Sequence, residues 1–273
     1  MLTGRVQLPV EKAWRMNPCL AGRGSFRSLS EQKGAQMTAF VFDMDDTLYL
    51  RSAPYMETFR HFFPGEDRID PSLLLKRSRF WSDYEFDRFK KGEITRDVMN
   101  ALRVLDTLEE FSLPGDMALA ENFQRIYEDK QRRISLLPGM RDLLEGLKEK
   151  GFFLGMISNG SVDHQLMKYH ALDLEDLIPR SRVLISAETP FHKPDPRIFD
   201  VYLEKTGLQR GETWYIGDSV ENDILPAREA GLHTVLCRWE ESKNEKGSAA
   251  ADRTARSVKE LAAILDEIIF SCS

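Results

Sequence analysis

Three carboxylates fall within four positions directly after the short apolar run Ala39–Phe42. They are Asp43, Asp45 and Asp46, and Thr47 follows them. Like charges this close raise one another's pKa and repel, so the cluster is costly unless a cation offsets the charge. Carboxylate oxygens suit Mg²⁺, which binds one or two of them beside phosphate. The run therefore indicates a magnesium site, with an acidic turn that caps a helix at Thr47 as the alternative.

Two further motifs offer groups that could bind an anion. Ser158 and Asn159 follow an apolar run at residues 152–157. A hydroxyl with backbone N–H groups at a strand end can cradle an anion, although the same residues also form ordinary turns. Lys193 precedes Pro194 in a segment that a second proline stiffens. Its ammonium could hold a phosphoryl group, although most lysines are only solvated.

A second acidic motif follows the apolar run at residues 213–216. It consists of Gly217, Asp218 and, five residues after Asp218, Asp223. The helix dipole favours acids at the start of a helix, and this explains Asp223 better than it explains Asp218. We therefore keep both carboxylates as candidate site residues.

Short apolar runs alternate with amphipathic helical stretches from Thr38 onward, and this alternation places the motifs. The runs are rich in branched and aromatic residues, as buried parallel strands are; they are Ala39–Phe42, 152–157, 182–186, 213–216 and His233–Cys237. The alternation predicts an α/β fold with a Rossmann-like, doubly wound parallel sheet. In such sheets ligands bind beyond the carboxyl ends of the strands, and every motif above falls at or just beyond one of those ends.

The interval at residues 50–134 breaks this alternation and is too long for a loop. Its helical stretches lie near 55–63, 71–91, 95–106 and 116–133. We expect a helical cap domain at 50–134, inserted into an α/β core made of 38–49 and 135–273. The cap holds an aromatic cluster that could line a substrate pocket, although we favour helix packing; its members are Phe80, Trp81, Tyr84, Phe86 and Phe89.

Jointly, the four motifs are similar to those of the haloacid-dehalogenase-like hydrolase superfamily, and the resemblance runs from Thr38 to about Ile268. The Asp-x-Asp-x-Thr run, the serine at a strand end, the lysine before Pro-Asp-Pro and the Gly-Asp-x-x-x-x-Asp run are its four motifs. The inserted helices resemble its helical-cap subfamily. The resemblance implies a Mg²⁺-dependent phosphatase that acts on a small phosphorylated metabolite.

The resemblance also implies a role for each acidic residue. Asp43 would be the nucleophile and form an aspartyl-phosphate. Asp45 would protonate the leaving alkoxide and later activate water. Mg²⁺ would be held by Asp43, the Asp45 backbone carbonyl and Asp218. Asp223 would support these ligands without touching the metal directly, or would help to place Lys193.

The phosphoryl oxygens would be bound by Ser158, the Asn159 amide and Lys193. Dehalogenating relatives lack an acid at the position of Asp45, because a halide needs no proton, so a 2-haloacid dehalogenase is the less favoured alternative. A phosphomutase and a non-catalytic binding module are the others. Asp46, often glycine in relatives, is expected to be a tolerated turn residue.

Among the histidines, His164, His192 and His233 are expected to have no catalytic role. The sequence does not single out a substrate among sugar phosphates, phosphoglycolate and nucleotides, and it favours no oligomeric state.

Composition narrows the function further. The 38 basic and 44 acidic residues give a net charge of −6, which offers no general attraction to nucleic acid or to an anionic membrane. The three cysteines have no paired spacing, so we expect neither a disulfide framework nor a zinc site. This cysteine usage suits a cytoplasmic location, which we therefore expect.

No apolar run approaches the ~18–20 residues that cross a bilayer. Residues 1–37 are expected to be a disordered extension without a catalytic role. A targeting segment and a translation start at Met37 are the alternatives.

Overall fold

The computed structural model describes residues 38–239 and 250–271. The N-terminal extension expected at 1–37 lies outside these residues, and so do Cys19 and Cys272. Cys237 is a buried free thiol. Within the described ranges, no helix is long and apolar enough to cross a membrane.

A six-stranded parallel sheet forms the centre of the described chain, in the order β3-β2-β1-β4-β5-β6. Its strands are β1 (Ala39–Phe42), β2 (Phe153–Ser158), β3 (Val183–Ile185), β4 (Thr213–Gly217), β5 (His233–Cys237) and β6 (Arg253–Ala255). The five expected strands are present, with ends shifted by at most one residue. The edge strand β6 was not expected.

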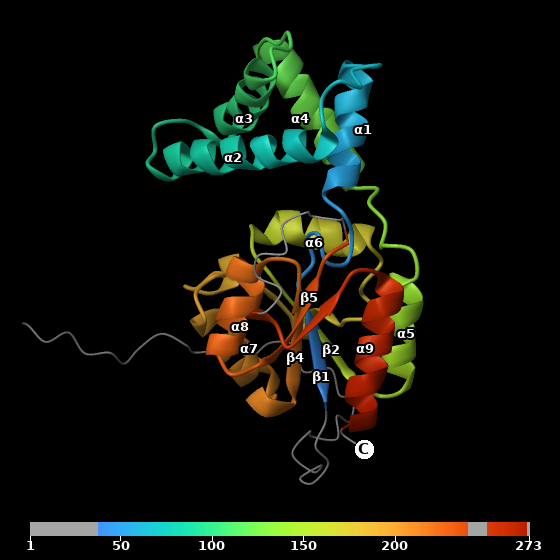
Figure 1. The fold of residues 1–273 in the computed structure, drawn as a ribbon. Coiled ribbons are helices and arrows are strands. Elements are labelled where there is room, and N and C mark those ends of the chain that lie inside the picture. The colour runs from blue at the N-terminus through green and yellow to red at the C-terminus, as the bar shows by residue number, and fades with distance from the viewer. Residues whose placement is uncertain (1–37, 240–249, 272–273) are drawn as a thin grey trace, which may run out of the picture. The chain divides into compact units, whose positions relative to one another are not determined.

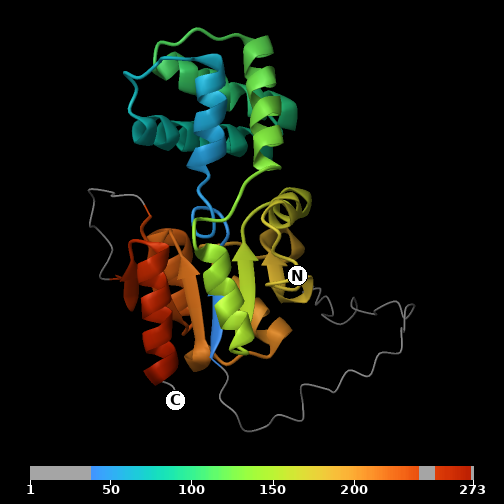
Figure 2. The same cartoon turned by 90° about the vertical axis from the view of Figure 1, so that its right-hand side faces the viewer.

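Helices cover both faces of this sheet (Figures 1 and 2). One face packs against α5 (Met140–Glu149) and α9 (Val258–Ser271), and the other against α7 (Arg197–Thr206) and α8 (Leu225–Glu229). The central strand β1 is buried on both faces, because Phe40 and Phe42 join the first cluster while the alternate residues join the second. Each buried phenylalanine contributes roughly 2–3 kcal/mol. The predicted α/β, doubly wound fold is confirmed.

Four helices lie between β1 and α5 in the sequence: α1 (Ser52–Phe62), α2 (Pro71–Lys90), α3 (Arg96–Glu110) and α4 (Met117–Gln131). We call residues 50–134 the helical insert. Side chains of Asp70, Thr95 and Asp116 accept hydrogen bonds from backbone N–H groups at the starts of α2, α3 and α4. The four helices share a hydrophobic cluster of their own. This separate cluster supports our interpretation of the insert as a cap domain.

The expectation that the aromatic residues of α2 pack between helices is wrong for three of them. Phe80, Tyr84 and Phe86 are 48%, 52% and 46% exposed. The reason is that α2 buries a different face, on which Leu74 and Glu85 are its buried residues. Trp81 and Phe89 are only partly buried.

Candidate active site

Strands β2 and β3 lie on one side of β1 in the sheet, and β4, β5 and β6 lie on the other. The motifs meet at this switch in strand order. Strand β1 pairs with β2 on one side and with β4 on the other, so Phe42 lies opposite both Met156 and Ile216. Loops that leave the carboxyl ends of three neighbouring strands therefore start side by side. Crevices at such a switch point are where open α/β sheets bind ligands.

Asp43 stands at the centre of this crevice and is buried, 5% exposed. Its backbone N–H donates to the Ile216 carbonyl at 2.8 Å, which extends the β1–β4 pairing by one residue. Lys193 Nζ lies 2.6 Å from one carboxylate oxygen, and Thr47 Oγ1 donates to the other at 3.3 Å. Burial raises the pKa of Asp43 to about 6, against the opposing effect of Lys193. The carboxylate is thus held in place yet only partly stabilised in its charged form.

Lys193 bridges two of the predicted carboxylates. Its Nζ lies 2.6 Å from Asp43 Oδ1, 2.6 Å from Asp223 Oδ1 and 3.0 Å from the Tyr215 hydroxyl. Although burial lowers the pKa of Lys193, Asp223 and Asp43 raise it well above its usual value, so the ammonium stays charged. The Asn159 side chain fixes the lysine backbone, donating to its carbonyl at 2.7 Å and accepting from its N–H at 3.0 Å.

Three carboxylates converge at the metal site expected from the sequence. One oxygen from each of Asp43, Asp218 and Asp223 lies within 4.8 Å of the others. Burial raises the pKa of Asp218 well above its usual value, and the neighbouring Asp43 and Asp223 raise it further. A divalent cation among these oxygens would remove the conflict, and an all-oxygen set suits a hard cation. The residues present therefore fit such a metal ion.

Gly217 explains how Asp223 can come so close to the end of β4. A Cβ atom at residue 217 would lie 2.6 Å from both Cβ and Cγ of Asp223. Asp223 lies on a π-helical turn, Val220–Ile224, and its second oxygen accepts from the Ser219 N–H at 3.0 Å. Asp223 is thus oriented by Ser219 and Lys193, which agrees with a placing role.

The phosphate-binding candidates at the end of β2 are also close to Lys193, but two of their side-chain groups are already engaged. Ser158 is buried, and its hydroxyl donates to Gln165 Oε1 at 3.1 Å. The amide of Gln165 in turn donates to the Asn159 carbonyl at 2.8 Å. The Asn159 side chain is bound to the Lys193 backbone, so any contact of Asn159 with a phosphoryl oxygen would come from its backbone N–H.

Asp45 has two partners that sequence reasoning missed. Lys168 Nζ lies 2.7 and 2.6 Å from its two oxygens, and the Tyr49 hydroxyl donates to Oδ1. Burial would raise the pKa of Asp45, but Lys168 and Arg51 lower it well below its usual value. Lys168 lies on the buried face of α6 (Val162–Ala171), three residues after Gln165. No pattern in the sequence marks Lys168 as a partner of Asp45, because the contact depends on how α6 packs.

Asp46 is a turn residue, as expected, but its side chain is also engaged. Its φ of 60° is left-handed, which explains why glycine suits this position. Its carboxylate accepts from the backbone N–H and from Nε of Arg51, both at 2.8 Å, and forms an ion pair with Arg79 of α2. Asp46 therefore connects the turn after β1 to the helical insert.

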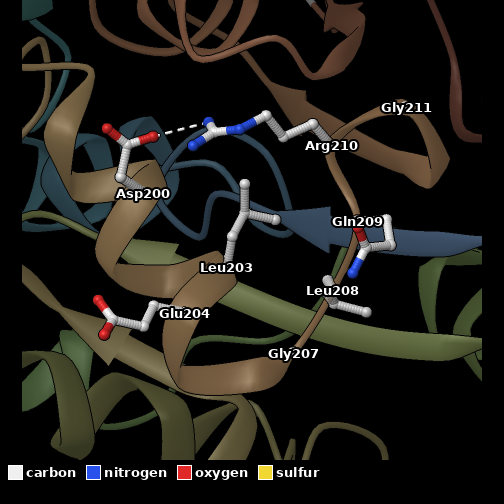
Figure 3. Close-up of a pocket in the computed structure, with 8 residues that line it drawn as sticks. All are labelled: Asp200, Leu203, Glu204, Gly207, Leu208, Gln209, Arg210 and Gly211. Atoms are coloured by element: carbon white, nitrogen blue, oxygen red, sulfur yellow. Dashed lines mark hydrogen bonds and ion pairs between the residues drawn. The ribbon is translucent and has the colours of Figure 1, made fainter.

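The hollow drawn in Figure 3 is a different place. It is lined by eight residues between Asp200 and Gly211, around the end of α7, where Asp200 and Arg210 form an ion pair at 2.7 Å. These residues precede β4, whereas the acidic motif follows it. The hollow therefore lies at the opposite end of the sheet from Asp43.

The family model described as haloacid dehalogenase-like hydrolase matches residues 40–237. The chain belongs to this family. It is 29% identical to a ribulose-1,5-bisphosphate 5-phosphatase of Halopiger xanaduensis, over 80% of this chain and 91% of that protein. It is 33% identical to a glyceraldehyde 3-phosphate phosphatase of Methanocaldococcus jannaschii, over 84% and 96%. The family resemblance deduced from the motifs is confirmed.

Solved structures share the fold. A Bacillus subtilis HAD-hydrolase, YfnB, bound to magnesium superposes with a TM-score of 0.62 at 24% identity, over 84% of this chain and 99% of that one. An L-2-haloacid dehalogenase from Xanthobacter autotrophicus gives a TM-score of 0.62 at 16% identity, over 84% and 98%. At these identities the likeness extends to the fold alone.

Proposed function

We propose that this hydrolase cleaves phosphate monoesters of small metabolites, with Mg²⁺ at the carboxylate cluster and an aspartyl-phosphate on Asp43. The observation that carries the proposal is the Asp43 carboxylate, which lies 2.6 Å from Lys193 and within 4.8 Å of the oxygens of Asp218 and Asp223. The two relatives named as sugar-phosphate phosphatases support this substrate class. We infer a cytoplasmic location from cysteine usage alone.

The chemistry follows from the groups present. Asp43 attacks phosphorus, a bond forms between its carboxylate oxygen and phosphorus, and the bond from phosphorus to the alcohol oxygen breaks. Asp45 gives its proton to the departing alkoxide, then takes one from the water that attacks the aspartyl-phosphate and releases inorganic phosphate. Lys193 holds the phosphoryl oxygens. When bound, Mg²⁺ offsets the charge of the carboxylates and of the transferring group.

Asp45 favours a phosphate ester over a haloacid as the substrate. An alkoxide is a poor leaving group that needs a proton, whereas a halide leaves without one. The carboxylate of Asp45 is held beside Asp43 by Lys168 and Tyr49, which is a costly arrangement for a group without a role.

Hydrolysis of p-nitrophenyl phosphate, with and without Mg²⁺, tests the proposal. We expect Mg²⁺-dependent turnover that Asp43→Asn abolishes and that the matched surface variant Asp266→Asn retains. Borohydride should reduce the acyl phosphate and convert residue 43 to homoserine during turnover. Undiminished activity of Asp43→Asn would refute the nucleophile, and turnover of 2-haloacids without phosphate release would support a dehalogenase instead.

A further inference from the structure

Arg103, on helix α3 of the insert, is held by neutral side chains. Its Nη2 donates to Gln124 Oε1 at 2.7 Å, and its Nη1 lies 3.4 Å from Ser82 Oγ, and both partners are neutral. Among the described residues, no acidic side chain forms an ion pair with it. Glu128 raises the pKa of Arg103, but its carboxylate accepts from the Gln124 amide at 2.6 Å and forms no ion pair with the guanidinium.

The other cations of this region differ from Arg103. Arg51 and Arg79 both pair with Asp46, and Lys168 pairs with Asp45. Arg103 is partly buried, and burial lowers its pKa. Removing a guanidinium from water without a counter-charge is unfavourable. An anion that binds there would supply the missing partner.

Helix α4 links the surroundings of Arg103 to those of Asp45. Arg103 donates to this helix, and Gln131 Oε1 at the end of the same helix lies 3.2 Å from His164 Nε2 on α6. Lys168, four residues after His164 on α6, pairs with Asp45. The charges act on the same side chain, because Arg103 lowers the pKa of His164 and Asp45 raises it, beside the larger lowering that burial causes.

We propose that Arg103 binds an anionic group on the alcohol part of the substrate, so that the preferred phosphate monoester carries a second anion, either a carboxylate or another phosphate. This rests on the proposed phosphatase function, in which the alcohol leaves beside Asp45. A guanidinium matches both anions through paired N–H groups. A site built to bind a charge discriminates strongly against an analogue that lacks it.

Two substrate pairs test this, and in each pair the members differ by one anionic group. Phosphoserine differs from phosphoethanolamine by a carboxylate, and ribulose 1,5-bisphosphate differs from ribulose 5-phosphate by a phosphate. We expect the wild-type enzyme to prefer the doubly anionic member of one pair by about tenfold or more in kcat/KM. The pair that shows the preference identifies the anion.

The variant Arg103→Met should bring that kcat/KM ratio close to one, and Arg103→Lys should keep part of it because the charge remains. The matched control is Arg125→Met, which removes an exposed arginine of α4 and should leave the ratio unchanged. If near-ultraviolet circular dichroism shows that Arg103→Met does not fold, the kcat/KM ratio of Arg103→Lys alone tests the proposal, and this ratio should then lie between one and the wild-type value.

Two results would overturn the proposal. One is a wild-type enzyme that turns over both members of each pair equally well. The other is an arginine variant that slows both members by the same factor and leaves their ratio intact. Failure of the phosphatase function itself looks different, since the wild-type enzyme would then release no phosphate from p-nitrophenyl phosphate.

Discussion

Lys168 Nζ lies 2.7 and 2.6 Å from the two carboxylate oxygens of Asp45, and the lysine is only 2% exposed. This pairing fixes the direction of the carboxylate and keeps it ionised until substrate arrives. An ionised carboxylate suits the second half of the reaction, in which Asp45 takes a proton from water. For the first half the carboxyl group must carry a proton, so Asp45 must take one up, from solvent or from a singly protonated phosphate ester, as the substrate weakens its contact with Lys168.

The variant Lys168→Met should therefore lower kcat more than it changes KM. We expect a loss of about 10- to 100-fold with alkyl phosphates, because Asp45 loses its orientation, and a smaller loss with p-nitrophenyl phosphate, whose leaving group needs little help. Lys168→Arg should restore part of the activity. The control Lys150→Met breaks an exposed ion pair with Asp266. Equal losses with both kinds of substrate would show that Lys168 serves only the fold.

Binding of Mg²⁺ should weaken as the pH falls below about 6. Burial raises the pKa of Asp43 to about 6, and burial also raises the pKa of Asp218. A cation favours the charged form of both groups, so its binding must release protons, and added protons must compete with it. Isothermal titration calorimetry at pH 7.5 and 5.5 measures the change in Kd. In Asp218→Asn we expect weaker binding at both values, and a Kd independent of pH would contradict the carboxylate site.

The sequence located the residues that follow strand ends but not their partners from distant helices. Asp43 and Asp218 stand in contiguous motifs after apolar strands, so the parallel sheet brings them together whatever the rest of the chain does. Lys168 meets Asp45 only because α6 packs against the sheet, and 123 residues separate the two. No local pattern encodes that contact.

Two elements were misjudged for physical reasons. The strand β6 has three residues, Arg253–Ala255, and its burial is uneven because it lies at the sheet edge. It lacks the apolar run that marks the central strands. The aromatic residues of α2 were assigned to the interior by their type, but Phe80 and Tyr84 lie on its exposed face. Residue type alone did not determine which face of this helix is buried.

The left-handed turn at Asp46 can be separated from its ion pairs. Asp46→Gly keeps the backbone conformation but loses the contacts with Arg51 and Arg79. Asp46→Ala loses the same contacts and also strains the left-handed backbone. Because alanine is strained at positive φ, we expect the free energy of unfolding of Asp46→Ala to be about 1 kcal/mol lower than that of Asp46→Gly. Urea denaturation of the two variants measures the difference. If the two variants are equally stable, the conformation at residue 46 is not left-handed in solution.

Gly217 should tolerate no side chain, because Asp223 occupies the space. In Gly217→Ala the new Cβ would meet the Asp223 side chain at 2.6 Å, so the acid must move and release Lys193 from one of its two carboxylates. We expect a loss of about 1–3 kcal/mol in stability from the overpacking. With Lys193 displaced, kcat should fall at least about tenfold. Chemical denaturation and p-nitrophenyl phosphate turnover measure the two effects.

Gly211 provides the matched control for that substitution. It precedes the same strand, and a Cβ added there meets nothing within 4 Å. Gly211→Ala should therefore change the free energy of unfolding by no more than about 0.5 kcal/mol and leave turnover unchanged. If Gly217→Ala behaved like Gly211→Ala, Asp223 would not stand against the end of β4. The bridge through Lys193 to Asp43 would then not be the arrangement that supports catalysis.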